Sequence, residues 1–283
     1  MANIGKYNQL TVIRIDPYGA ALEADELGEI TLPNRFMPEN CQVADRVDVF
    51  IFLDSQDRLS ATTQKVNAQV GEVAFLKVVQ VNQVGAFLDL GIAKDLLVPF
   101  NQQQISMEVD KSYLVYVYLD EDSNRIVASS KLNRFIIHAA TIYKMGQSVE
   151  LMISDITDIG YSAVINHRHW GVLFFSDVVK PLKIGQKMKG FIKNIREDGK
   201  INLCLQAIGY AKVDSLSVKI LKQLEKNAGF IPLSDKSPAE AIYEQFAVSK
   251  KSFKMTIGAL YKKRLITISK QGITLNPKPL SNK

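Results

Sequence analysis

Aromatic and basic side chains are interleaved in the second half of this sequence, in a segment near residues 161–200. They are Tyr161, Arg168, Trp170, Phe174, Lys193 and Lys200. Aromatic rings stack on unpaired nucleobases, at about 1–3 kcal/mol per base, while Lys and Arg neutralise backbone phosphates. These residues predict a site for single-stranded nucleic acid. Its sequence selectivity should be weak, because every base offers a π face.

A second basic cluster lies near the C-terminus. It comprises Lys250, Lys251, Lys254, Lys262, Lys263, Arg264 and Lys270. On a helix with about 100° per residue, the first four fall on one arc opposite Phe253 and Leu260. Gly258 lies in that arc and would let a ligand backbone approach closely. Lys250 and Lys251 would occupy the first turn, where the helix dipole disfavours cations, so the pattern favours an external anion there.

Catalytic and metal chemistry find little support in the sequence. His167 and His169 would share one side of a strand, but no Cys or carboxylate lies in motif spacing with them. The glycines of VGAFLDLG form neither a Walker loop nor a dinucleotide fingerprint. No spacing supports a Ser-His-Asp or Cys-His nucleophile. We therefore predict a protein that is not an enzyme and has no metal or other cofactor.

These candidate residues lie in a repeated module. The strings LDSQDRLSATTQ (53–64) and LDEDSNRIVASSK (119–131) share an acidic turn, an Arg and a strand. Upstream, LTVIRIDPYGAAL (10–22) and LKVVQVNQVGAFL (76–88) share two strands around a Gly, and a diverged third copy spans 149–206. Each copy carries about five short alternating strands, which remove their exposed edges by closing into a small barrel. We predict OB-fold barrels at 1–66, 67–143 and 144–211.

The hydrophobic period changes from two to 3.6 in residues 212–283. A first helix is expected from Asp214 to just before Gly229, a second from Pro238, and a third capped by Ser249 and running to about Leu265. The expected core residues of these helices are Leu216, Ile220, Leu221, Leu224, Ala241, Ile242, Phe246, Val248, Phe253, Ile257, Leu260 and Tyr261. A hairpin over 266–275 would complete a winged helix-turn-helix. The predicted fold is thus mainly β, with a C-terminal α+β domain.

The second copy resembles the S-one-type RNA-binding domain of the largest small-subunit ribosomal protein. The matching residues are Phe87, Val98, Asp120 and Arg125, and Pro99 replaces the family's His. This resemblance implies that Phe87 and Arg125 bind RNA. In the third copy it aligns Tyr161 after the Gly, Phe174 with the His and Lys200 with the Arg.

Three such modules followed by a winged helix resemble the conserved virulence factor B family of bacterial RNA-binding proteins. The strings VGAFLDLGIAKDLLVPF, LDEDSNRIVASSKL and SPAEAIYEQFAVSKKSFKMTIGALYKKRLI carry the resemblance. It implies a cytoplasmic RNA binder in post-transcriptional control of gene expression, and not an enzyme.

The charge distribution and the cysteine content agree with a cytoplasmic RNA binder. The chain has 283 residues with a net charge of +6, and its four predicted segments carry −4, −2, +3 and +9 in order. This asymmetry predicts that the C-terminal half meets a polyanion. Two distant cysteines exclude a disulfide framework and favour a reducing cytoplasm. We expect no secretory signal, because Met1–Tyr7 lacks an apolar region, and no membrane span.

We therefore expect a single-stranded RNA-binding protein in which the third barrel and the winged helix form one RNA track and the first two barrels serve as scaffold. Two alternatives stay open. One is a transcription regulator whose winged helix reads duplex DNA. The other is an interaction scaffold for the ribosome, a nuclease or other RNA-processing proteins.

Overall fold

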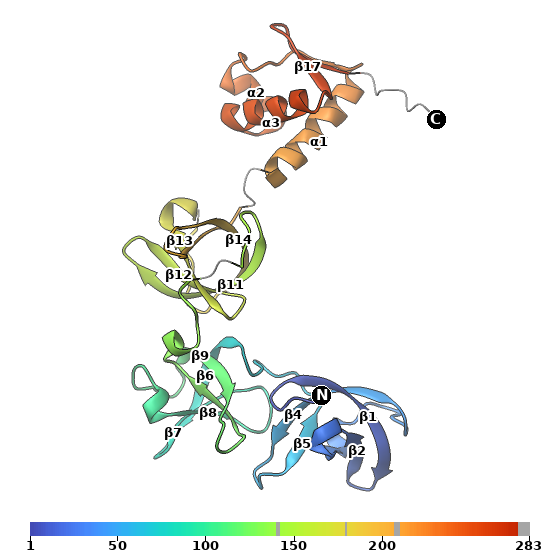
Figure 1. Ribbon diagram of the computed structural model, residues 1–283, viewed down its shortest axis with the longest axis vertical. Helices are drawn as coiled ribbons and strands as arrows, with labels where there is room; N and C mark the ends of the chain where they lie inside the picture. The colour runs from blue at the N-terminus through green and yellow to red at the C-terminus, as the bar shows by residue number, and fades with distance from the viewer. Residues whose placement is uncertain (140–141, 179, 207–209, 277–283) are drawn as a thin grey trace. The chain divides into compact units, whose positions relative to one another are not determined.

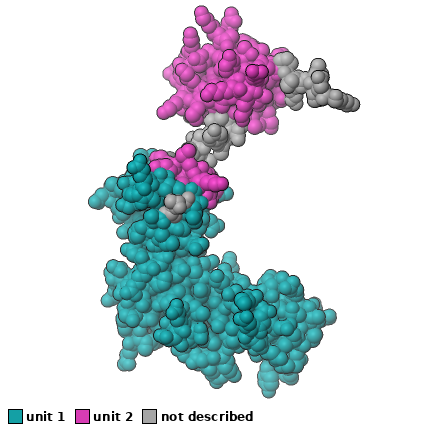
Figure 2. Space-filling model, viewed as in Figure 1, with its two compact units in different colours: residues 1–143, 149–189, 195–203 teal, residues 144–148, 190–194, 204–283 magenta. Residues whose placement is uncertain are grey.

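The computed structural model describes residues 1–139, 142–178, 180–206 and 210–276. Three closed barrels of five strands each are followed by a smaller domain that contains three helices (Figure 1). The described residues divide into two compact units, one within 1–143, 149–189 and 195–203 and the other within 144–148, 190–194 and 204–276 (Figure 2). Among the helices of these described ranges, none combines the length and the apolar character that a membrane span requires.

The three barrels share one topology. The first contains β1 (Tyr7–Asp16), β2 (Gly19–Glu23), β3 (Glu29–Pro33), β4 (Arg46–Leu53) and β5 (Leu59–Thr62). The second contains β6 (Val73–Val81), β7 (Gly85–Leu88), β8 (Leu96–Pro99), β9 (Ser112–Leu119) and β10 (Ile126–Ser129). The third contains β11 (Ser148–Thr157), β12 (Gly160–Ile165), β13 (His169–Phe174), β14 (Lys187–Ile195) and β15 (Ile201–Cys204). In each, the third strand pairs in parallel with the fifth, which closes the OB-type order. The predicted fold class is confirmed; the module boundaries stay predictions.

One glycine fixes the register of each barrel. Gly19, Gly85 and Gly160 open the second strand and lie opposite the last residue of the third strand. A Cβ at any of the three would collide with a backbone carbonyl oxygen of that strand. This close approach explains why the repeat keeps a glycine there, and it places the three copies in one structural alignment.

The C-terminal domain is built as the apolar periodicity predicts. Its elements are α1 (Tyr210–Lys226), β16 (Phe230–Ile231), α2 (Ala239–Phe246), α3 (Lys250–Lys262), β17 (Ile266–Ile268) and β18 (Ile273–Leu275). Phe253, Ile257 and Leu260 of α3 are buried in the core shared with α1 and α2. The Ser249 side chain accepts a hydrogen bond from the Ser252 N–H, as expected for a cap.

Two details of this domain differ from the sequence prediction. Helix α1 begins at Tyr210 rather than at the predicted Asp214. Residues 210–213, which precede Asp214, include neither Gly nor Pro, so nothing in their types keeps them out of the helix. Tyr261 was expected in the core, but 56% of its surface is exposed. It follows Leu260 and projects to the solvent side of α3.

Candidate nucleic-acid interface

The third barrel carries a groove of about 840 Å³ on the outer face of β12 and β13. Its floor includes Ser162, Trp170 and Val172, and one wall comes from residues 130–134 and His138, which connect the second and third barrels. Ser162 and Val172 lie opposite each other in the sheet, as Phe87 and Leu97 do in the second barrel. The groove therefore occupies the strand face that the repeat has in common.

Cations surround this groove. Lys131, Arg134, Arg196 and Lys200 line it, and Asp155 adds a carboxylate. Arg196 and Lys200 are exposed and flank Asp198, at 3.3 and 3.6 Å from its carboxylate. Two cations sharing one anion leave an excess of positive charge at the rim, where a phosphate backbone would run.

Arg196 is not among the residues predicted from the sequence, although a comparison of the equivalent turns in the three repeats identifies it. The Arg196 N–H bonds to the Lys200 carbonyl at 2.9 Å, as Asp54 does to Arg58 and Asp120 to Arg125 in the other copies. The third turn thus has Arg where the first two have Asp. Aligning REDGK with DSQDR would have identified this charge inversion, which makes the third face basic.

Trp170 contributes an aromatic surface to the groove. The ring is half-buried on β13 and stacks on His138, with ring centroids 6.0 Å apart and an interplanar angle of 29°. Ile137 fixes His138 in place, because its backbone N–H and C=O bond to Arg168 and Trp170 at 2.9 Å. The segment around Ile137, which follows the second barrel, is therefore joined to the third barrel, and His138 is a candidate residue that the sequence did not indicate.

The prediction that Tyr161 stacks on RNA is wrong. Only 5% of Tyr161 is exposed, its ring packs edge-on against Phe175, and its hydroxyl accepts a hydrogen bond from the Leu182 N–H at 3.2 Å. The glycine register explains the error. The residue directly after Gly160 points into the barrel, and the next one, Ser162, takes the outward position that Phe87 has in the second copy.

The other residues of the third barrel that were predicted to bind RNA differ in how exposed their side chains are. Phe174 is half-buried on β13, two and four residues beyond Val172 and Trp170 and so on the same strand face. Arg168 is exposed in the turn before β13. Lys193 is half-buried on β14 and is not among the residues that line the groove.

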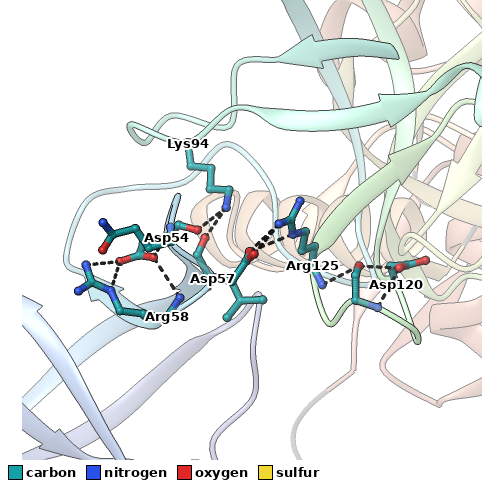
Figure 3. A network of polar contacts seen from close by, with 9 residues as sticks. Asp54, Asp57, Arg58, Lys94, Asp120 and Arg125 are labelled. Carbon is teal, nitrogen blue, oxygen red and sulfur yellow. Dashed lines mark hydrogen bonds and ion pairs between the residues drawn. The ribbon is translucent and has the colours of Figure 1, made fainter. Parts of the chain in front are cut away.

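The face of the second barrel is already engaged by the first barrel. Phe87 is half-buried and lines an apolar pocket of about 250 Å³ that also includes Phe52 of the first barrel. The Arg125 guanidinium binds the Asp57 carboxylate at 2.7 Å (Figure 3). The role of Arg125 in RNA binding stays a prediction, and in this structure its exposed side chain is paired with an acid of the first barrel.

The outer face of α3 combines lysines with two large apolar side chains. Lys251, Lys254 and Lys262 are exposed, as are Lys263, Arg264 and Lys270 beyond the helix, whereas Lys250 is half-buried. Met255 and Tyr261 are 53% and 56% exposed among these lysines. Apart from its chain neighbours and the backbone of α3 itself, no described atom would lie within 4 Å of a Cβ at Gly258. A strand of nucleic acid could reach both the lysine charges and the Tyr261 ring.

The histidines of the third barrel have structural partners. His167 Nδ1 accepts a hydrogen bond from the Val73 N–H, and His169 Nδ1 lies 2.9 Å from the Tyr143 hydroxyl. Within the described part of the chain, no group of three or more His, Cys, Asp or Glu side chains could hold a metal ion. Burial, and then the charge of Arg168, lowers the pKa of His169.

The stability of the protein should fall when His169 is forced to accept a proton. Its folded pKa lies below the ordinary value, so the unfolded chain binds more protons and unfolding is favoured as the pH falls from about 7.5 to about 5.5. The melting temperature should decrease over this range, and His169→Gln should reduce the decrease. His138→Asn, at an exposed histidine, should keep it. An unchanged pH dependence in His169→Gln would contradict the assignment.

Comparisons with known proteins agree with this architecture. An S1 domain family model matches residues 4–64 and 70–131, and a CvfB-like winged helix domain model matches residues 218–275. The chain is 30% identical over 249 residues to the uncharacterized protein YitL of Bacillus subtilis, covering 82% of this chain and 80% of that protein. It is 24% identical over 247 residues to conserved virulence factor B of Staphylococcus saprophyticus, covering 85% of this chain and 83% of that protein.

A solved structure is also similar. It is a multidomain protein with nucleic acid binding domains from Streptococcus pneumoniae, with 21% sequence identity and a TM-score of 0.40 over 96% of this chain and 98% of that one. The sequence identity to YitL over most of both chains, the S1 matches and the winged-helix match lead to one assignment. The chain belongs to the conserved virulence factor B family.

Proposed function

We propose that this protein binds single-stranded RNA with weak sequence selectivity and acts in post-transcriptional regulation of gene expression. Its family is an arrangement of nucleic-acid-binding domains and not a known enzyme family. The observation that carries the proposal is the groove of the third barrel, where the Trp170 ring lies among Lys131, Arg134, Arg196 and Lys200. An aromatic ring between cations suits a base and its flanking phosphates.

The exposed face of α3 supports binding to a phosphate backbone rather than reading of a duplex. Between residues 250 and 262 the helix has no Arg, Asn or Gln, the residue types that most often read base edges in the major groove. Lysine is a point charge that contacts phosphate without regard to sequence. We propose that this face and the groove bind the same RNA.

Competition binding separates RNA from DNA as the preferred ligand. The full chain, with a fluorescent single-stranded RNA, is challenged with unlabelled single-stranded RNA, single-stranded DNA and duplex DNA at low and at physiological salt. We expect single-stranded RNA to compete best and the affinity to fall steeply with salt, because phosphate contacts release counterions. Stronger competition by duplex DNA would favour the transcription regulator instead. The full chain is needed, because a fragment beginning at residue 144 would lose His138 from the groove wall.

A further inference from the structure

Cationic side chains on the strand face of the second barrel bind an acidic turn of the first barrel. The Arg125 guanidinium donates from Nη2 to both Asp57 carboxylate oxygens at 2.7 Å and from Nε to one of them at 3.1 Å (Figure 3). Lys94 Nζ donates to the backbone carbonyls of Leu53 and Asp54 at 2.8 and 2.7 Å. Two cations of the second barrel thus bind one turn, residues 53–58, of the first.

These cations lie on the face that corresponds to the groove of the third barrel. Arg125 has the turn position of Lys200, and Phe87 has the strand position of Ser162. Phe52 and Leu53 of the first barrel lie over part of this face and line the apolar pocket that contains Phe87. The surface that we propose to bind nucleic acid in the third barrel is therefore occupied in the second.

The local sequence of the two turns explains why Arg125 reaches across. In the first barrel, Asp54 binds Arg58 of its own turn at 3.0 Å. In the second barrel, Asp120 instead accepts hydrogen bonds from the Ser123 hydroxyl and N–H, at 2.6 and 3.1 Å. Arg125 is left to pair with Asp57, and its hydrogen bonds and charge lower the pKa of that carboxyl, so Asp57 is ionised near neutral pH.

Apolar packing fixes the two barrels beneath this polar contact. Phe50 of β4 is 0% exposed and belongs to the core cluster of the second barrel, together with Val66 and Ala68 of the connecting segment. A backbone hydrogen bond of 2.8 Å joins Asn67 to Leu90 and ties the connection to the second barrel. The first barrel is therefore held on this face by continuous packing.

We propose that the first barrel occupies the strand face of the second barrel as a bound ligand would. In this contact the Asp57 carboxylate binds Arg125 where a backbone phosphate of nucleic acid would bind. A carboxylate bound by both its oxygens to a guanidinium has the same geometry and sign of charge as a bound phosphate. Opening this contact would free the Arg125 guanidinium for a phosphate and expose more of the Phe87 ring to nucleic acid. The second barrel is then a closed nucleic-acid site within the chain.

The test uses the full chain with Arg196→Glu and Lys200→Glu, so that the groove of the third barrel does not dominate binding. In this background Asp57→Lys is compared with Asp48→Lys, the same charge change at an exposed position of β4. We expect Asp57→Lys to bind single-stranded RNA about tenfold more tightly than Asp48→Lys, as expected for one or two added phosphate contacts. Adding Phe87→Ala should abolish this gain.

Equal affinities of the Asp57→Lys and Asp48→Lys variants would overturn the proposal, and so would a gain that persists with Phe87→Ala. A milder pair, Asp57→Asn and Asp48→Asn, removes charge without adding a lysine and should change affinity in the same direction. The result is independent of the proposed function of the third barrel. Absence of RNA binding by the unmodified chain would contradict that function and leave this comparison intact.

Discussion

Replacing Arg196 and Lys200 together with glutamate should weaken binding of single-stranded RNA by about 100-fold, or about 2.7 kcal/mol. Both side chains are exposed at the rim of the groove and share Asp198 as an acidic partner. Reversing them removes two phosphate contacts and places carboxylates beside the RNA backbone. The dependence of log K on log salt should become shallower by about 0.7 for each phosphate of the single strand that is no longer neutralised.

A matched variant controls for net charge in this experiment. Lys183 and Lys189 are exposed on the third barrel and do not line the groove. Changing both to glutamate alters the charge of the same barrel by the same amount, and it should cost much less affinity. If the two double variants lose equal affinity, RNA responds to the overall field of the barrel and the groove is not its site.

Replacing Lys251, Lys254 and Lys262 of α3 with glutamate is the second change with a large expected effect, about 30-fold or about 2 kcal/mol in RNA affinity. All three side chains are exposed on the face that also carries Tyr261. Glutamate at position 251 is favoured by the helix dipole and glutamate at position 262, in the last turn, is disfavoured by it, each by about 0.3–1 kcal/mol. The two effects offset each other, so unfolding of the domain should not explain the weaker binding. Fluorescence anisotropy measures the affinity, and circular dichroism confirms the fold.

Helix α1 provides the control for this variant. Lys219, Lys222 and Lys226 are also exposed lysines of the C-terminal domain. Their replacement with glutamate should leave most of the RNA affinity, because residues 219–226 include no aromatic side chain on which a base could stack. An equal decrease in both triple variants would contradict a specific role for the α3 face.

The fold was predictable because its signals are local. Alternation of apolar residues, and a glycine at the start of each second strand, predict the barrels. The Ser249 cap and the stripe that contains Phe253 and Leu260 predict the winged helix. Where two faces of one strand both carry apolar residues, periodicity could not decide between them. Tyr161 was therefore assigned outward although the register turns it inward.

The candidate site was only partly predictable, because contacts between modules depend on the tertiary arrangement. Trp170 was identified from its type, but its stacking on His138 depends on backbone pairing around Ile137. Arg125 matched a family pattern, yet its actual partner is Asp57, 68 residues away in the sequence. A repeat alignment predicts which positions are equivalent, and not which of the equivalent faces is covered.

Under the proposed function, RNA binds the third barrel and the winged helix while the second barrel is closed. Ultraviolet cross-linking of the full chain to single-stranded RNA, followed by mapping of the cross-linked peptides, tests this assignment most directly, because aromatic rings stacked on bases cross-link efficiently. We expect cross-links at Trp170, Phe174 and Tyr261, and none at Phe87. Cross-links concentrated at Phe87, with none in the third barrel or the C-terminal domain, would contradict the assignment.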